Sequence, residues 1–211
     1  RSSDLMLLTP AAYMEKHGIF DSPTTAAHCV WLEDEDFDIL KRHGVTVACC
    51  PASNLKLASG YANVPKMLES GINVALGTDG AASNNNLNIM QDMYLFGVVY
   101  KGYFRDPTII TPAEVLHAAT RAGALSQGRD DSGLLAVGMR ADLCVLNTDT
   151  PQFTPMTSAA CNVVYAAQGA DIRMTMVDGE ILYRDGEFKT IDIEKVKAEV
   201  QRRTDSILSR L

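Results

Sequence analysis

Three successive units, each a short apolar run followed by a helical pattern, constrain this chain more than any other feature of its sequence. The apolar runs cover residues 24–32, 45–51 and 72–79. Alternation of strands and helices is typical of a parallel sheet whose strands are connected by helices. A closed barrel of eight such units takes about 250 residues. Three units therefore predict only part of a barrel, and the remainder would come from another segment.

The character of the sequence changes after a well-marked helix at residues 111–128, which begins with Thr111 as its N-cap. Residues 133–188 then show short alternating strands separated by Gly and Asp-Gly pairs, which are hairpin signals, with a connection at residues 151–155. An amphipathic helix ends the chain. We expect three portions: α/β residues 1–130, all-β residues 131–190 and helical residues 191–211.

Charge and composition exclude two classes of partner. The net charge is −7 and no Lys/Arg cluster stands out except two short pieces at residues 41–44 and 201–204, so the chain would repel a phosphate backbone and we expect no nucleic acid partner. No apolar run approaches the roughly 18 to 20 residues that span a bilayer, so we expect no membrane association. The five cysteines have no CxxC spacing and lie in apolar runs, which is typical of buried thiols in a reducing compartment. These observations predict a cytoplasmic protein.

His28 and Asp79 are the residues most suggestive of chemistry, because each lies at or near the C-terminal end of a predicted parallel strand. Barrels of parallel strands build their active sites at that end of the sheet. For His28 alone, a satisfied core histidine is the more common alternative. Asp79 follows an apolar run within the sequence GTDG, where a carboxylate is costly unless something pairs with its charge.

Four segments together resemble the amidohydrolase superfamily. They are, in chain order, AAHCV, CPASNLKL, GTDGAASNNN and GLLAVGMRADLCVL. The sequence is most similar to the 5-methylthioadenosine/S-adenosylhomocysteine deaminases and their chlorohydrolase and guanine deaminase relatives. The resemblance implies an α/β fold that is the C-terminal part of a metal-dependent hydrolase (β/α)8 TIM-like barrel, strands six to eight, plus part of a small β-sandwich.

The resemblance also implies roles for the two strand-end residues. Asp79 matches the aspartate of strand eight, which binds the metal, contacts substrate and takes a proton from the metal-bound water. His28 matches the histidine of strand six and would be catalytic, in orientation and proton transfer, with metal binding as the lesser alternative. The cofactor would be one divalent metal, zinc or alternatively iron.

Residues near these two have two interpretations each. Ser53 and Asn54, in an expected turn at residues 51–54, could contact substrate or only shape the loop. The polar residues 83–86 could cap the following helix or orient Asp79. Trp31 could border a purine pocket, although a core aromatic is the favoured interpretation.

The chain lacks most of the ligands that such a metal site needs. It contains no HxH pair, and capping or packing in predicted helices explains three of its histidines: His17, His43 and His117. A catalytic metal site takes three or more protein ligands. We therefore expect activity to require an N-terminal half of the same protein, and the start at Arg1 instead of Met suggests a fragment.

The expected function is hydrolytic deamination of adenine-type nucleosides, such as methylthioadenosine, S-adenosylhomocysteine or adenosine, by a homo-oligomer that is inactive without its N-terminal half. Two alternatives stay open. One is an amidohydrolase that deaminates or dechlorinates a guanine or triazine ring, because the fold does not determine the substrate. The other is a catalytically inactive half that serves in assembly.

Overall fold

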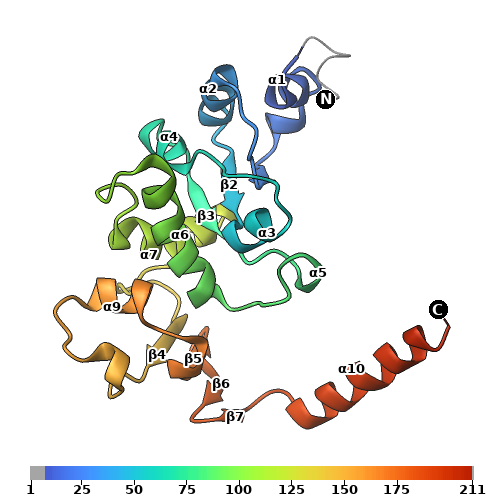
Figure 1. The fold of residues 1–211 in the computed structure, drawn as a ribbon, viewed down its shortest axis with the longest axis vertical. Helices are drawn as coiled ribbons and strands as arrows, with labels where there is room; N and C mark the ends of the chain where they lie inside the picture. Colours follow the sequence, from blue (N-terminus) through green and yellow to red (C-terminus); the bar gives the residue numbers. More distant parts are fainter. Residues whose placement is uncertain (1–7, 211) are drawn as a thin grey trace.

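The computed structural model describes residues 8–210 and shows a mixed α/β chain with one parallel and one antiparallel sheet (Figure 1). The first half contains α1 (Pro10–Lys16), η2 (Ile19–Asp21), β1 (Thr25–Ala27), α2 (Asp34–Arg42), β2 (Thr46–Cys49), α3 (Pro51–Lys56), α4 (Val64–Glu69), β3 (Val74–Leu76), α5 (Ala81–Asn84) and α6 (Ile89–Phe104). The second half contains α7 (Pro112–Ala119), α8 (Arg121–Ser126), β4 (Leu143–Leu146), η3 (Pro151–Phe153), α9 (Ala159–Tyr165), η4 (Gly169–Asp171), β5 (Ile172–Val177), β6 (Glu180–Arg184), β7 (Glu187–Phe188) and α10 (Ile193–Leu208).

The parallel sheet confirms the three predicted strand and helix units. Its strands lie in the order β1-β2-β3, and β2 pairs in parallel with both neighbours. Val47 in the middle strand lies opposite Ala26 and Val74 and is fully buried. Within residues 8–210 the sheet is open, and these strands close no barrel. His28 and Asp79 lie just beyond the C-terminal ends of β1 and β3 instead of inside the strands.

One face of the parallel sheet is covered by helices from the middle of the chain. α6, α7 and α8 all pack against β3 (Figure 1). The core between them contains Phe96, Tyr100 and Val115, together with Met67 from α4. Burial of each large apolar side chain contributes about 1.5–3 kcal/mol. This packing fixes β3, and therefore the loop that carries Asp79.

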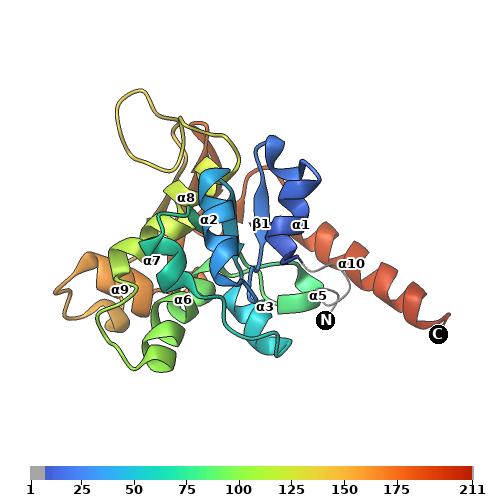
Figure 2. The same cartoon turned by 90° about the horizontal axis from the view of Figure 1, so that it is seen from above.

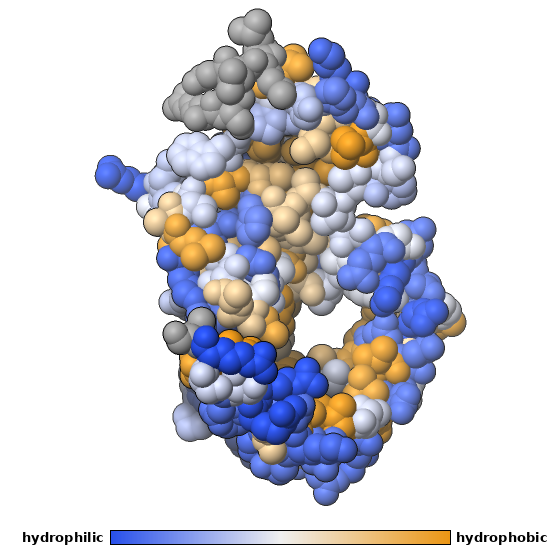
Figure 3. All heavy atoms as spheres, turned by 90° about the vertical axis from the view of Figure 1, so that its right-hand side faces the viewer, coloured by the Kyte–Doolittle hydropathy of each residue, from blue (hydrophilic) through white to orange (hydrophobic). Residues whose placement is uncertain are grey.

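The other side of the sheet is more open. In β1, Thr25 and Ala27 are exposed and Ala26 is half-buried, whereas all of β3 is buried. Figure 3 views the molecule from the right-hand side of Figure 1 and shows a hollow lined by apolar surface on this face. An exposed edge strand can pair with a further strand, and an exposed apolar hollow can be covered by further residues. Both are features of a partial sheet.

The antiparallel sheet has the order β4-β5-β6-β7, and it contains the short strands and hairpins that the Gly and Asp-Gly signals predicted. β5 and β6 are joined by the Asp-Gly turn at residues 178–179, where Asp178 and Gly179 both have positive φ. This conformation matches the type of turn that Asp-Gly favours between strands. The prediction of β-structure in this half is confirmed for these four strands.

Three segments differ from their predicted structure. The helix expected at residues 111–128 breaks at Thr120, which leaves the helical region (φ −129, ψ −86) while its Oγ1 donates to the Leu116 carbonyl. Residues 159–165 form α9 instead of a strand, because Ser158 caps the helix by accepting from Cys161 N–H and the segment packs on α6 and α7. The turn expected at residues 51–54 is the start of α3, with Pro51 at the favourable first position.

The C-terminal helix α10 is present as predicted, but none of its residues is buried. It extends away from the remainder of the chain in both views (Figures 1 and 2). Its apolar side chains Val196, Val200 and Ile207 are therefore exposed. Among residues 8–210, no helix has the length and apolar character required to cross a membrane.

Candidate active site

The predicted site residues come from three segments that meet at the C-terminal ends of the parallel strands. His28 directly follows β1, Ser53 and Asn54 lie on α3 after β2, and Asp79 lies between β3 and α5. In Figure 1, α3 and α5 lie at the same end of the sheet. This placement is a consequence of parallel pairing, because the C-terminal ends of all three strands lie at one edge.

Direct contacts join these four residues. Ser53 Oγ donates to Asp79 Oδ2 at 2.7 Å, and His28 Nδ1 bonds Asn54 Oδ1 at 2.8 Å. The second ring nitrogen, His28 Nε2, lies 3.8 Å from Asp79 Oδ2. Ser53 and Asn54 are almost fully buried, at 1% and 4% exposure, whereas the side chains of His28 and Asp79 remain 39% and 28% exposed. The buried Ser53 and Asn54 therefore hold the accessible Asp79 and His28 in place by hydrogen bonds.

The hydrogen bond to Asn54 determines the state of the histidine ring. A side-chain amide oxygen only accepts, so His28 donates from Nδ1. In the neutral imidazole, Nε2 is then the nitrogen with a free lone pair, and it faces Asp79. The arrangement places a proton acceptor beside a carboxylate, with one ring orientation selected by Asn54.

The carboxyl group of Asp79 is favoured in its ionised form. The hydrogen bond from Ser53, followed by those from Gly80 N–H at 2.7 Å and from Ser83, lowers the pKa of Asp79 below its ordinary value. When it is protonated, His28 lowers this pKa further by its charge. A carboxylate has about four acceptor positions, so one stays open after these three bonds. The carboxylate can therefore accept a proton or donate to a cation while it stays anchored.

A cavity of about 390 Å³ opens beside these residues, and Trp31 and Leu57 form an apolar part of its lining. Ligand pockets commonly have volumes of roughly 300–1,000 Å³. The expectation that Trp31 is a core aromatic is wrong, because the residue is 79% exposed. Its indole is nevertheless held in place, since Nε1 donates to the Ser59 carbonyl at 3.1 Å. Gly60 permits this close packing, because a Cβ there would lie 3.1 Å from Val30 Cγ1.

The polar residues 83–86 have roles that differ from the capping alternative. The N-cap of α6 is Asn88, whose side chain accepts from Met90 N–H. Asn84 instead points inward, and its amide donates to the Thr78 carbonyl at 2.8 Å and to the carboxylate of Asp92 at 3.1 Å. Sequence analysis missed Asp92, because a single acidic residue within an apolar helix gives no local signal of its partners.

The remaining histidines lie away from the site, as predicted. His17 and His43 are the C-caps of α1 and α2, and His43 Nε2 contacts Glu15 at 2.7 Å. His117 lies in the last turn of α7. None of the three accompanies Asp79.

The side chains at this site could provide only some of the ligands that a metal ion needs. Asp79 offers an anionic oxygen and His28 an imidazole nitrogen, which are ligand types that zinc accepts. A catalytic zinc site takes three protein ligands and an open position. Within residues 8–210, no group of three His, Cys, Asp or Glu side chains gathers as a metal site. Further ligands would have to come from outside this part of the chain.

Curated relatives are similar in sequence to this chain over most of its length. It is 46% identical over 202 residues to a 5-methylthioadenosine/S-adenosylhomocysteine deaminase from Acetivibrio thermocellus, covering 95% of this chain and 47% of the relative. It is 44% identical over 185 residues to a 5'-deoxyadenosine deaminase from Methanothermobacter thermautotrophicus, covering 88% and 43%. The chain therefore spans about half the length of the curated relatives it matches.

Solved structures share its fold. An adenosine deaminase from Xanthomonas campestris with bound zinc superposes with a TM-score of 0.94 at 28% identity, over 99% of this chain and 48% of that one. A zinc complex of the atrazine chlorohydrolase from Arthrobacter aurescens TC1 gives 0.87 at 27% identity, over 95% and 45%. Residues 2–182 match the amidohydrolase family. The predicted family is thereby confirmed: the chain belongs to the amidohydrolase family.

Proposed function

We propose that this chain is the C-terminal half of a hydrolytic deaminase of adenine-type nucleosides, and that it acts with an N-terminal half that supplies further metal ligands. The observation that carries the proposal is the linked arrangement of Asn54, His28, Asp79 and Ser53 at the strand ends. The similarity to relatives named as deaminases of adenine nucleosides supports the proposed substrate class.

The architecture of the whole protein is part of this proposal. Residues 1–130 would form strands six to eight of a (β/α)8 barrel with their helices, residues 131–190 part of a composite β-sandwich, and residues 191–211 a terminal helix. The exposed β1 edge and the apolar hollow beside it support further strands on that side. Similar coverage of about half of each solved relative supports the same division.

Asp79 would hold a divalent metal, zinc or alternatively iron, with ligands from the N-terminal half. When bound, the metal would supply hydroxide at neutral pH by lowering the pKa of water to about 7. Asp79, kept ionised by Ser53, would accept a proton at a carboxylate oxygen. His28 would orient substrate and transfer a proton at Nε2, the nitrogen left free by Asn54.

The cavity lining would hold the substrate base. Trp31 and Leu57 present apolar surface to the cavity, and the planar indole suits stacking against a purine. Ser53 and Asn54 are nearly buried, so their main task would be to position Asp79 and His28, with substrate contact a lesser part.

A second candidate is hydrolysis of a triazine or guanine ring. The similarity to an atrazine chlorohydrolase at a TM-score of 0.87 favours considering it, because the same scaffold removes a different leaving group there. Only substrate tests separate the two, since neither the site residues nor the fold determines the ring that is bound.

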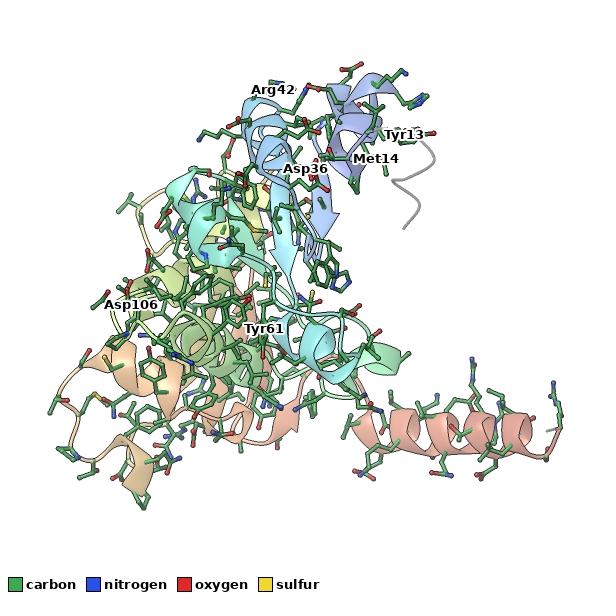
Figure 4. The ribbon with its side chains drawn as sticks, turned by 45° about the horizontal axis from the view of Figure 1, so that its top comes forward. Tyr13, Met14, Asp36, Arg42, Tyr61 and Asp106 are labelled. Carbon is green, nitrogen blue, oxygen red and sulfur yellow. The ribbon has the colours of Figure 1, made fainter. Side chains whose placement is uncertain are left out.

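The test is a chimera in which this chain replaces the matched C-terminal part of the Acetivibrio thermocellus relative, with that parent protein as the positive control. Ammonia release is measured with methylthioadenosine, S-adenosylhomocysteine, adenosine and guanine, and chloride release with atrazine. Asp79→Asn should abolish deamination. Asp106→Asn is the matched control, because Asp106 also accepts from a hydroxyl and a backbone N–H, both from Thr108. It lies in the loop after α6 (Figure 4).

Deamination of adenine nucleosides that survives Asp106→Asn and is lost in Asp79→Asn supports the proposal. A folded, zinc-containing chimera that acts only on guanine or atrazine supports the second candidate. A folded, zinc-containing chimera with no hydrolytic activity refutes both and supports an assembly role.

A further inference from the structure

Asp92 is a fully buried carboxylate that the proposed chemistry does not use. It lies in the first turn of α6 and is 0% exposed. Burial raises the pKa of Asp92 above its ordinary value, against the two hydrogen bonds it accepts. A buried charge is costly unless its partners compensate. Its two partners therefore indicate what the residue does.

The first partner connects Asp92 to the helix that carries Ser53 and Asn54. Asp92 Oδ1 accepts from the backbone N–H of Ala52 at 3.0 Å. Ala52 lies in the first turn of α3, where N–H groups have no partner within the helix. Cys50, the N-cap residue, supplies no side-chain bond. Asp92 thus anchors the start of α3 from a position 40 residues further along the chain.

The second partner connects Asp92 to the segment that carries Asp79. Asp92 Oδ2 accepts from Asn84 Nδ2 at 3.1 Å, and the same amide group donates to the Thr78 carbonyl at 2.8 Å. Thr78 directly precedes Asp79. Asn84 therefore links the buried carboxylate to the backbone beside the site.

We propose that Asp92 is a positioning residue that holds α3 and residues 78–84 together, so that Ser53 meets Asp79 and Asn54 meets His28. We call the contacts of Asp92 with Ala52 and Asn84 the clamp. Its effect on catalysis rests on the proposed function, whereas the clamp itself rests on the structure alone. Apart from these contacts, the two segments are joined by the Ser53–Asp79 bond, at 2.7 Å, and by a bond from Lys56 to Asn85 at the exposed end of α5. A displacement of about 1 Å between reacting groups can cost about 100-fold in rate.

Asp92→Asn in the chimera tests the clamp. The Ala52 and Asn84 groups both donate, so the new amide would direct its own donor at one of them and break that contact. Loss of a group that positions a site residue typically costs about 10- to 100-fold in activity. We expect kcat to fall by that factor with a smaller change in KM, since Trp31, the proposed contact to the base, lies on neither α3 nor residues 78–84.

Asp36→Asn is the matched control. Asp36 is also 0% exposed and accepts from the backbone N–H groups of Ala11 at 3.3 Å and Glu33 at 2.9 Å. It lies in the first turn of α2, where it contacts α1, and away from α3 and α5 (Figure 4). We expect this variant to lose stability while kcat is unchanged. Asp171→Asn serves instead if that variant does not fold, since Asp171 accepts from Gln152 and Gln168.

Hydrogen exchange measured by mass spectrometry gives a second readout that needs no turnover. Asp92→Asn should accelerate exchange at α3, where Asn54 N–H bonds Cys50 at 3.0 Å, and at α5, where Asn84 N–H bonds Gly80 at 3.0 Å. Asp36→Asn should accelerate it at α1 and α2 only.

The outcomes separate the clamp from the proposed function. Local acceleration at α3 and α5 supports the clamp even if the chimera proves not to be a deaminase. Unchanged exchange there, or equal losses of kcat in Asp92→Asn and the control, overturns it.

Discussion

Asn84→Ala should destabilise the protein far more than the same change at its neighbour Asn86. Asn84 is 8% exposed, and its amide makes two hydrogen bonds, one to the Thr78 carbonyl and one to the Asp92 carboxylate, whose two oxygens both accept from N–H donors. Asn86 is exposed, and so are its own hydrogen bonds, from Asn88 N–H at 3.1 Å and to Gln91. The two residues are chemically identical and lie in the same polar tract, so the comparison sets buried hydrogen bonds against exposed ones.

The magnitude follows from the two bonds. A hydrogen bond to a charged group contributes about 1.5–3 kcal/mol and a neutral one about 0.5–1.5 kcal/mol, so Asn84→Ala should cost roughly 2–4 kcal/mol. An exposed substitution such as Asn86→Ala usually changes stability by less than about 0.5 kcal/mol. In a chain of this size, 1 kcal/mol shifts Tm by about 2–4 °C. The expected drop for Asn84→Ala is therefore roughly 5–15 °C.

Thermal unfolding followed by far-ultraviolet circular dichroism measures the difference, with urea unfolding as a second method at constant temperature. Equal melting temperatures for the two variants would refute the reasoning, because they would mean that the Thr78 and Asp92 contacts contribute nothing net. A loss in Asn84→Ala that disappears when Asp92 is also changed to Asn would locate most of the cost in the Asn84–Asp92 bond.

Three further predictions concern individual side chains. Ser53→Ala removes the main cause of the lowered Asp79 pKa, so that pKa should rise and the acid limb of the pH–activity profile should move to higher pH. An acid limb that does not move would contradict this role of Ser53. Trp31→Ala should raise KM for adenine nucleosides with kcat nearly unchanged, as steady-state kinetics of the chimera would show, because the indole lines the cavity and has no proposed part in proton transfer. Iodoacetamide at neutral pH should alkylate the exposed Cys144 and spare Cys49, because burial raises the pKa of Cys49 to about 12. Peptide mapping by mass spectrometry measures both sites, and labelling of Cys49 in the folded chain would contradict its burial.

The positions of the strands could be predicted because local patterns and tertiary structure agree there. Apolar runs predicted β1, β2 and β3, and Thr111 with Glu114 predicted the start of α7 through the capping box that the structure contains. The position of His28 and Asp79 after strands predicted their proximity, since parallel strands end together. These inferences needed only near neighbours in sequence.

The errors arose where distant contacts decide the structure. The β-branched residues in α9 favour a strand by propensity, but packing on α6 and α7 overrides that weak preference. Trp31 is apolar and was expected in the core, yet the hydrogen bond to the Ser59 carbonyl holds it at the cavity. The role of Asp92 depends on partners 8 and 40 residues away, which no periodic pattern reveals.

Backbone conformation at the site explains why such distant contacts are needed. His28, Cys29 and Asp79 have φ values of 67°, 45° and 59°, in the left-handed region that non-glycine residues rarely adopt. Each such residue costs about 1–3 kcal/mol and persists only where its surroundings over-determine it. For His28 those surroundings are the Ala48 carbonyl, which accepts its N–H at 2.8 Å, and the Asn54 side chain. The side chains that position the site residues therefore also stabilise their strained backbone. Loss of the clamp should release the strand ends and the site residues together.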